Sequence, residues 1–130
     1  MYWGHRHLAE GLSAYQGLRL YSVSFHAFTI GSYELCSYEG TRNWNSYTVP
    51  VNQVYTQTVS VSSSGWNTVD LETPYYINSN QDLWVFMHNT EPFDNLQLFL
   101  CTADGDYGVY YSGNPLSYTH NNASGYAFLI

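Results

Sequence analysis

Apolar and polar residues alternate over most of the chain, with the two-residue period of a strand that buries one face. In segment 20–30, apolar residues from Tyr21 to Ala27 take every second position, and small polar residues or His26 lie between them. Comparable β-rich segments are 33–38, 54–61, 66–73, 83–88, 96–102, 107–112 and 126–130. Gly, Pro, Asn and Ser separate them, so the pattern predicts about eight short strands.

Helical periodicity is confined to Leu8–Ala14, which Gly11 interrupts, so at most one or two turns are expected there. The continuous apolar run Leu83–Met87 predicts a strand covered on both faces. Segments 43–52 and 111–124 have no clear period and are expected to be long loops. With 130 residues and no internal repeat, the chain predicts one all-β domain over residues 1–130, an antiparallel β-sandwich of jelly-roll type.

Composition narrows the function classes. A hydrophobic content of 45% excludes an intrinsically disordered chain. The formal charge of −7, with three Arg and no Lys, disfavours nucleic acids and anionic membrane surfaces as partners. The longest apolar runs are too short for membrane insertion. Aromatic residues reach 18% against 10% charged residues, so the polarity comes from hydroxyls and amides, which suit neutral polyhydroxylated ligands.

The two cysteines, Cys36 and Cys101, lie far apart in strand-like segments and form no CxxC pattern. A structural zinc site is therefore not expected. One disulfide and two buried free thiols both fit the sequence.

Several motifs together resemble jelly-roll ancillary modules of secreted Bacteroidetes proteins, of the cleaved-adhesin and carbohydrate-binding-module-like kind found beside gingipain-type peptidases. The most specific pair is Gly65-Trp-Asn-Thr-Val followed by Asp82-Leu-Trp-Val85. The segments that carry the resemblance are 12–23, 54–59, 65–71, 77–85 and 125–130.

The resemblance implies an extracellular or cell-surface module, excised from a larger secreted protein and adjoining a catalytic domain. It implies an ancillary role and supplies no ligand, because the matching residues belong to the scaffold. Trp66 and Trp84 fall inside these motifs, so both are expected to pack in the core or against a sheet.

No nucleophile motif is present: Gly11-Leu-Ser-Ala-Tyr15 departs from G-x-S-x-G at its last position. Acidic residues are scattered singly, and a small glycoside hydrolase would need the fold to bring two of them about 5–9 Å apart. We therefore expect a protein that is not an enzyme.

No cofactor is expected. Asp104 and Asp106 have the spacing of the first two ligands of a calcium loop, but Gly108 stands where the third ligand belongs. We favour a hairpin turn between segments 96–102 and 107–112, with a structural calcium as the alternative. His5 and His7 lie near the chain start, where we expect a frayed end rather than a metal site.

Trp44 is the leading candidate for a binding residue. It lies among polar residues without strand alternation, so the ring is expected either to be exposed or to fold back over the sandwich end. An exposed indole can stack on a sugar ring, with Arg42, Asn45 and Tyr47 beside it.

A second aromatic cluster comprises Tyr110, Tyr111, Tyr118 and His120. Alternation places Tyr110 and Tyr111 on opposite faces, so one subset packs inside and the other meets solvent. From these clusters we predict a non-catalytic carbohydrate-binding or glycan-adhesion module for a neutral polysaccharide. The alternative is a structural or protein-interaction module.

Overall fold

The computed structural model describes residues 2–27, 29–44, 47–89, 100–102, 108–111, 120–123 and 126–128, with the side chains of 3–27, 29–43 and 48–88. The elements are β1 (Tyr2–His7), α1 (Ala9–Leu12), the 3-10 turn η1 (Ser13–Tyr15), β2 (Arg19–Ala27), β3 (Gly31–Trp44), β4 (Tyr47–Val61), β5 (Gly65–Tyr76), β6 (Leu83–Asn89), β7 (Leu100–Thr102), β8 (Gly108–Tyr111), β9 (His120–Ala123) and β10 (Tyr126–Phe128).

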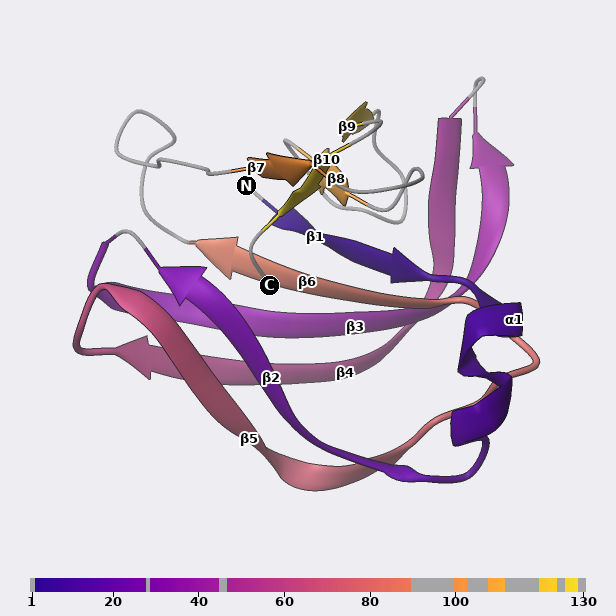
Figure 1. Ribbon diagram of the computed structural model, residues 1–130, viewed down its shortest axis with the longest axis horizontal. Helices are drawn as coiled ribbons and strands as arrows, with labels where there is room; N and C mark the ends of the chain where they lie inside the picture. The colour runs from indigo at the N-terminus through magenta and orange to yellow at the C-terminus, as the bar shows by residue number, and fades with distance from the viewer. Residues whose placement is uncertain are drawn as a thin grey trace.

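Two antiparallel layers form the molecule (Figure 1). One is a six-stranded sheet in the order β4-β3-β6-β1-β8-β9, and β2 and β5 form a two-stranded sheet that crosses its face. Strands β7 and β10 pair separately. The short α1 and η1 lie at one end, as the sequence predicts. The prediction of an all-β sandwich is confirmed.

The first six strands pair in a nested order. β3 pairs with its neighbour β4, β2 pairs with β5, and β1 pairs with β6, so each pair encloses the previous one in the sequence. The described residues form ten strands rather than about eight, and β3, β4 and β5 have 14, 15 and 12 residues, so they are not short. The jelly-roll connection of the remaining strands stays a prediction.

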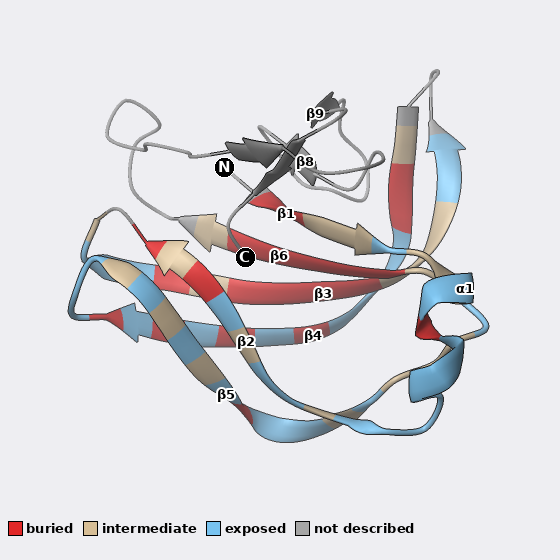
Figure 2. Ribbon diagram, viewed as in Figure 1, coloured by how far each residue is buried: buried red, intermediate tan, exposed pale blue. Residues whose placement is uncertain are grey.

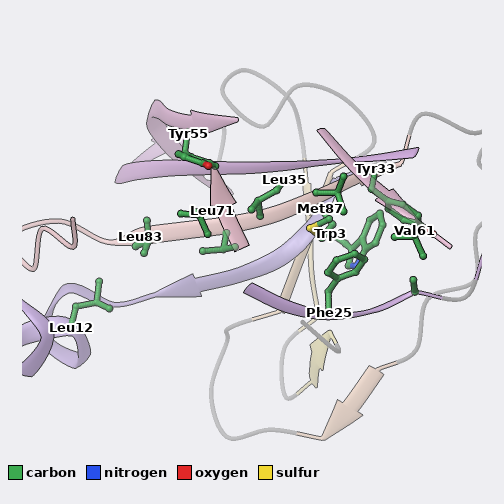
Figure 3. Packing of buried hydrophobic residues seen from close by; sticks show 13 residues of the cluster. Trp3, Leu12, Phe25, Tyr33, Leu35, Tyr55, Val61, Leu71, Leu83 and Met87 are labelled. Carbon is green, nitrogen blue, oxygen red and sulfur yellow. The ribbon is translucent and has the colours of Figure 1, made fainter. Parts of the chain in front are cut away.

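The main core lies between the six-stranded sheet and the β2–β5 pair (Figure 3). Trp3, Phe25 and Tyr33 meet there, with edge-to-face or tilted ring contacts at 5.8–5.9 Å. Such contacts stabilise by ~0.5–1.5 kcal/mol beyond the burial of the rings. Leu12 from α1 closes the far end of this core beside Leu83.

Strand β6 is buried on both faces, as its continuous apolar run predicts (Figure 2). Leu83, Val85 and Met87 belong to the main core, whereas Trp84 and Phe86 belong to a second cluster on the opposite face of the sheet. The prediction that Trp84 packs inside is confirmed.

The expectation of a frayed chain start is wrong, because β1 is a central strand between β6 and β8. Gly4 allows this insertion: a Cβ there would lie 1.8 Å from the Val85 carbonyl oxygen of β6. The sequence signal was hidden because His5, Arg6 and His7 interrupt the apolar pattern.

The expectation of a loop over 43–52 is also wrong. Residues 43–44 belong to β3 and residues 47–52 to β4, and the backbone pairs Trp44 with Tyr47. β3 bends at Gly40, where φ is +79°, a conformation that favours glycine. The Trp84 indole N–H stabilises the bend, because it donates hydrogen bonds to the Gly40 carbonyl at 2.9 Å and to Thr41 Oγ1 at 3.1 Å. In Figure 1 the hairpin turns away from the rest of the sheet beyond this point.

The β2–β5 pair contains a large irregularity. Ser22 pairs with Asp70 and Leu20 with Tyr75, so four residues of β5 (71–74) lie opposite Tyr21 alone. Pro74 lies inside β5 here, so the strand continues beyond the predicted segment 66–73. Leu20 takes the inward position, and Tyr21 points outward instead of joining the buried face that its alternation predicts.

Gln57 of β4 holds the bulged part of β5. Its buried amide donates to the Asp70 carbonyl at 3.0 Å and accepts from the Glu72 N–H at 3.0 Å. The Tyr55 hydroxyl donates to the same amide oxygen at 2.6 Å and accepts from the Thr73 N–H at 3.4 Å. Side chains thus satisfy backbone groups of the bulge that cannot pair with β2.

Cys36 is a buried free thiol, so of the two alternatives, a disulfide or a free thiol, the second holds for this residue. It donates a hydrogen bond to Glu34 Oε1 at 3.0 Å. Burial, followed by this contact with a carboxylate, raises the pKa of the Cys36 thiol, so the protein keeps it protonated and unreactive.

The strands near Asp104 and Asp106 do not form the predicted hairpin. Among the described pairs, β7 pairs with β10, and β8 pairs with β1 and β9. The two aspartates lie outside the described residues, so the calcium alternative stays a prediction. The predicted loop 111–124 is wrong in part, because residues 120–123 form β9.

The contact at Gly4 predicts that Gly4→Ala destabilises the fold strongly, by about 3 kcal/mol or more, because the backbone of β6 must move. Gly11→Ala in α1 is the control, since a Cβ there meets nothing within 4 Å. Urea unfolding monitored by tryptophan fluorescence compares the two variants. Equal stability of the variants would contradict the central placement of β1.

The Gln57 network predicts that Gln57→Ala lowers the free energy of unfolding by about 2–4 kcal/mol, because one buried and two part-buried hydrogen bonds are lost. Gln53→Ala on the same strand is exposed and should cost less than ~0.5 kcal/mol. Chemical denaturation measures both. A Gln57 variant as stable as the Gln53 variant would show that the bulge does not need the amide.

Candidate functional site

The outer face of the β2–β5 pair carries an exposed row of aromatic and polar side chains. Opposed residues of an antiparallel pair point to the same side of the sheet. Val23, Phe25 and Val69 point inward to the core. The residues between them point outward, in the pairs His26–Trp66, Ser24–Thr68 and Ser22–Asp70.

Trp66 forms one end of this face. Its side chain is 61% exposed, and the His26 ring meets it edge-on at 5.7 Å and 81°. Because the ring contact and the strand backbone both restrict the indole, its exposed surface is presented in a defined orientation. The expectation that Trp66 packs in the scaffold is wrong.

Tyr21 and Tyr76 form the other end, where they are 66% and 58% exposed. Arg19 is the backbone partner of Tyr76, and its guanidinium lies 4.6 Å from the centre of the Tyr21 ring. This cation–π contact holds the Tyr21 ring beside the strand and adds a five-proton donor group to the face.

Short polar side chains lie between the two aromatic ends. The Ser24 and Thr68 hydroxyls share a hydrogen bond of 2.8 Å, and Ser22 and Asp70 are exposed next to them. Hydroxyls and a carboxylate can donate to or accept from ligand hydroxyls. The face thus combines ring surfaces with hydrogen-bonding groups and carries charges of both signs, from Arg19 and Asp70.

Three of the predicted site residues, Arg42, Trp44 and Tyr47, lie where β3 ends and β4 begins. Backbone pairing places Trp44 opposite Tyr47, and Arg42 is exposed two positions before Trp44. Asn45 lies outside the described residues, as do the side chains of Trp44 and Tyr47. A binding role for this tip stays a prediction.

The second predicted cluster lies elsewhere in the six-stranded sheet. Tyr110 and Tyr111 belong to β8, and His120 of β9 is the backbone partner of Tyr111. Strands β6 and β1 separate β8 from β3 in the sheet order, so the two predicted clusters belong to different parts of the sheet. Tyr118 lies outside the described residues.

The sequence does contain a signal for the β2–β5 face. Trp66, Thr68 and Asp70 share one phase of the alternation, and Val69 and Leu71 take the other. A tryptophan in phase with Thr and Asp points to solvent. The resemblance of the surrounding motif to a scaffold segment masked this signal.

Asp82 and Glu39 have structural roles. The Asp82 carboxylate accepts hydrogen bonds from the Ala9 N–H at 2.9 Å and the Thr41 hydroxyl at 2.6 Å, which ties α1 to the bend of β3. Glu39 accepts a hydrogen bond of 2.6 Å from the Tyr75 hydroxyl. Burial, with this bond second, raises the pKa of Tyr75.

Two hollows lie near β1. One, of about 300 Å³, lies between β2 and the six-stranded sheet and has a mainly apolar lining that includes Leu20 and Val85. The other, of about 290 Å³, lies between β1 and α1 and includes His5, His7 and Glu10.

The imidazole rings of His5 and His7 stack, with their centres 6.2 Å apart. Desolvation of the ring, and secondly the nearby His5, lower the pKa of His7.

Within the described part of the chain, no group of three or more His, Cys, Asp or Glu side chains could hold a metal ion. In the same part, none of the helices is long and apolar enough to cross a membrane. Comparison with protein-family models, with curated proteins and with solved structures finds no match.

The lowered pKa of His7 predicts a stability that falls with acidification. Because the folded pKa lies below the unfolded value of about 6.5, the unfolded chain binds more protons as pH falls through this value. The free energy of unfolding should therefore decrease from pH 7.5 to 5.0. Burial also lowers the pKa of His88, so His7→Gln should weaken this pH dependence and the double variant with His88→Gln should weaken it further. Urea unfolding at several pH values measures this dependence of the free energy of unfolding on pH. If the dependence is the same in His7→Gln as in the unchanged protein, His7 is not its source.

Proposed function

We propose that this protein is a non-catalytic carbohydrate-binding module that uses the outer face of β2 and β5 to bind a neutral polysaccharide. The observation that carries the proposal is the exposure of three rings, Trp66, Tyr21 and Tyr76, on one face of a two-stranded sheet. Exposed rings of this size leave apolar surface in water, and contact with the C–H face of a sugar removes it.

The chemistry of the face supports a neutral sugar rather than an ionic ligand. Ser22, Ser24 and Thr68 offer hydroxyls between the rings, and the chain as a whole carries a formal charge of −7. Each ligand hydroxyl must exchange water for a protein partner, so the net gain per hydrogen bond is small. We therefore propose modest affinity, with most of it from ring stacking.

The proposal extends to the setting of the protein. We propose an extracellular or cell-surface location beside a catalytic domain, which follows from the resemblance of the scaffold motifs and agrees with the low content of charged residues. We propose a non-catalytic role as well, since no nucleophile motif is present and the carboxylates of Asp82 and Glu39 are engaged by hydrogen bonds that hold the fold.

A protein-interaction module is the second candidate, and β4 favours it. This 15-residue strand is at one edge of the six-stranded sheet and contains no charged residue. Val51 and Val54 on it are 41% and 37% exposed. An uncharged edge strand of this length can pair with a strand of another chain.

Removal of one ring tests the carbohydrate proposal. Trp66→Ala should weaken retention in affinity gels that contain xylan, mannan or a soluble cellulose derivative about tenfold, the equivalent of a stacking contact of ~1.4 kcal/mol. The free energy of unfolding should change by less than ~1 kcal/mol, because the side chain is mostly exposed. Trp66→Phe should retain part of the binding.

Tyr15→Ala is the matched control, since Tyr15 is an exposed aromatic residue of η1 outside the β2–β5 face. Trp44→Ala tests the hairpin tip in the same gels. The proposed face is wrong if Trp44→Ala abolishes retention and Trp66→Ala leaves it unchanged. Absence of retention by all the polysaccharides and by a glycan array would favour the protein-interaction candidate.

A further inference from the structure

We infer that the ligand is one extended, soluble polysaccharide chain that lies along β2 and β5 and contacts both aromatic ends of the face. This inference rests on the proposed function and adds the length and form of the ligand. It follows from the separation of the rings, from the shape of the ribbon and from the groups between its ends.

The separation of the two ends sets the length of the ligand. From His26, which lies beside Trp66, to Tyr21 there are five residue steps along β2, or about 16 Å at ~3.3 Å per residue. To Arg19, the partner of Tyr76, there are seven steps, or about 23 Å. A single sugar ring covers one aromatic side chain and cannot reach the other end.

The middle of the face supports a continuous ligand. Ser22, Ser24 and Thr68 are exposed and short, so they form a floor on which a chain can pass without obstruction. Of the two hollows near β1, one takes in Ser22 and Ser24 together with core residues such as Val85 on the inner side of β2, and the other lies beside α1. An open face of this kind contacts the side of a chain rather than its terminal unit.

The curvature of the ribbon selects a flexible chain. Figure 1 shows that β2 and β5 twist and curve together as they cross the sheet. The bulge opposite Tyr21 adds to the local twist, as bulges generally do. A rigid crystalline surface would touch one aromatic end at a time, whereas a soluble chain can follow the curve.

The charges on the face favour a neutral chain. Asp70 is exposed at its centre, and Glu72 is exposed close by in the bulge. Arg19 is the basic residue among the paired residues of the face, and its guanidinium lies against Tyr21. An anionic chain would meet both carboxylates near the middle of the face, and the net charge of −7 would repel it further.

A length series tests the inference. The probes are linear cello-, xylo- and manno-oligosaccharides of two to eight units, measured by isothermal titration calorimetry with the whole chain. For the series that binds, affinity should rise at least tenfold between two units and the length that spans about 16 Å, roughly four units, and then level off. Insoluble crystalline cellulose should retain the protein more weakly than the soluble chain.

Single variants at the two ends complete the test. Trp66→Ala and Tyr21→Ala should each lower the affinity for the six-unit ligand about tenfold and reduce the rise with length. Tyr15→Ala is the control and should leave the rise unchanged, and urea unfolding checks that each variant is folded. Because Tyr21 is 66% exposed, its removal should not unfold the protein.

The outcomes separate the inference from the proposed function. If two units bind as tightly as six, or if only one end matters at every length, the spanning chain is overturned and carbohydrate binding stands. Stronger retention by the crystalline form overturns the soluble chain in the same way. If no oligosaccharide or polysaccharide binds, both the inference and the proposed function fail.

Discussion

The buried amide of Gln57 is the interaction on which the β2–β5 layer depends. Where four residues of β5 lie opposite Tyr21 alone, the regular backbone ladder between the two strands is lost. Gln57 and Tyr55 from β4 supply hydrogen-bond partners for Asp70, Glu72 and Thr73 in its place. A peptide group that leaves water without a new partner costs free energy, so these part-buried hydrogen bonds allow β5 to bulge while it remains over the core.

The bulge in turn sets which side chains meet solvent. Leu71 fills the core within the bulge, and beyond it Leu20 and Tyr75 take the inward positions. Tyr21 and Tyr76 are thereby left on the outer side, the same side as Trp66. A regular ladder would have kept Tyr21 in phase with Val23 and Phe25, which are directed to the core. The second aromatic end of the candidate site therefore exists because the ladder is interrupted.

Local patterns in the sequence predicted much of the fold. Alternation located β2, β4, β5 and β6, and the apolar run at 83–87 correctly indicated a strand buried on both faces. The failures involve information that lies elsewhere in the chain. β1 is a strand because β6 and β8 flank it, and the hairpin beyond Gly40 is fixed by Trp84, 44 residues away. The Tyr21 end of the candidate site was missed for a similar reason, since it lies opposite the bulge that Gln57 of a different strand holds. The Trp66 end had a local signal, which the resemblance of its motif to a scaffold segment masked.

The central position of β1 has a consequence for how the chain acquires its structure during synthesis. β1 leaves the ribosome before its neighbours, yet the strands on its two sides begin at Leu83 and Gly108. More than seventy residues must therefore be made before β1 has its first partner strand, and about a hundred before it has both. Loop closure over such separations makes β topologies slow to form. In this interval the growing chain exposes Trp3 and an unpaired strand. A chaperone that covers them early would therefore help this protein more than a protein whose sheet is built from adjacent hairpins.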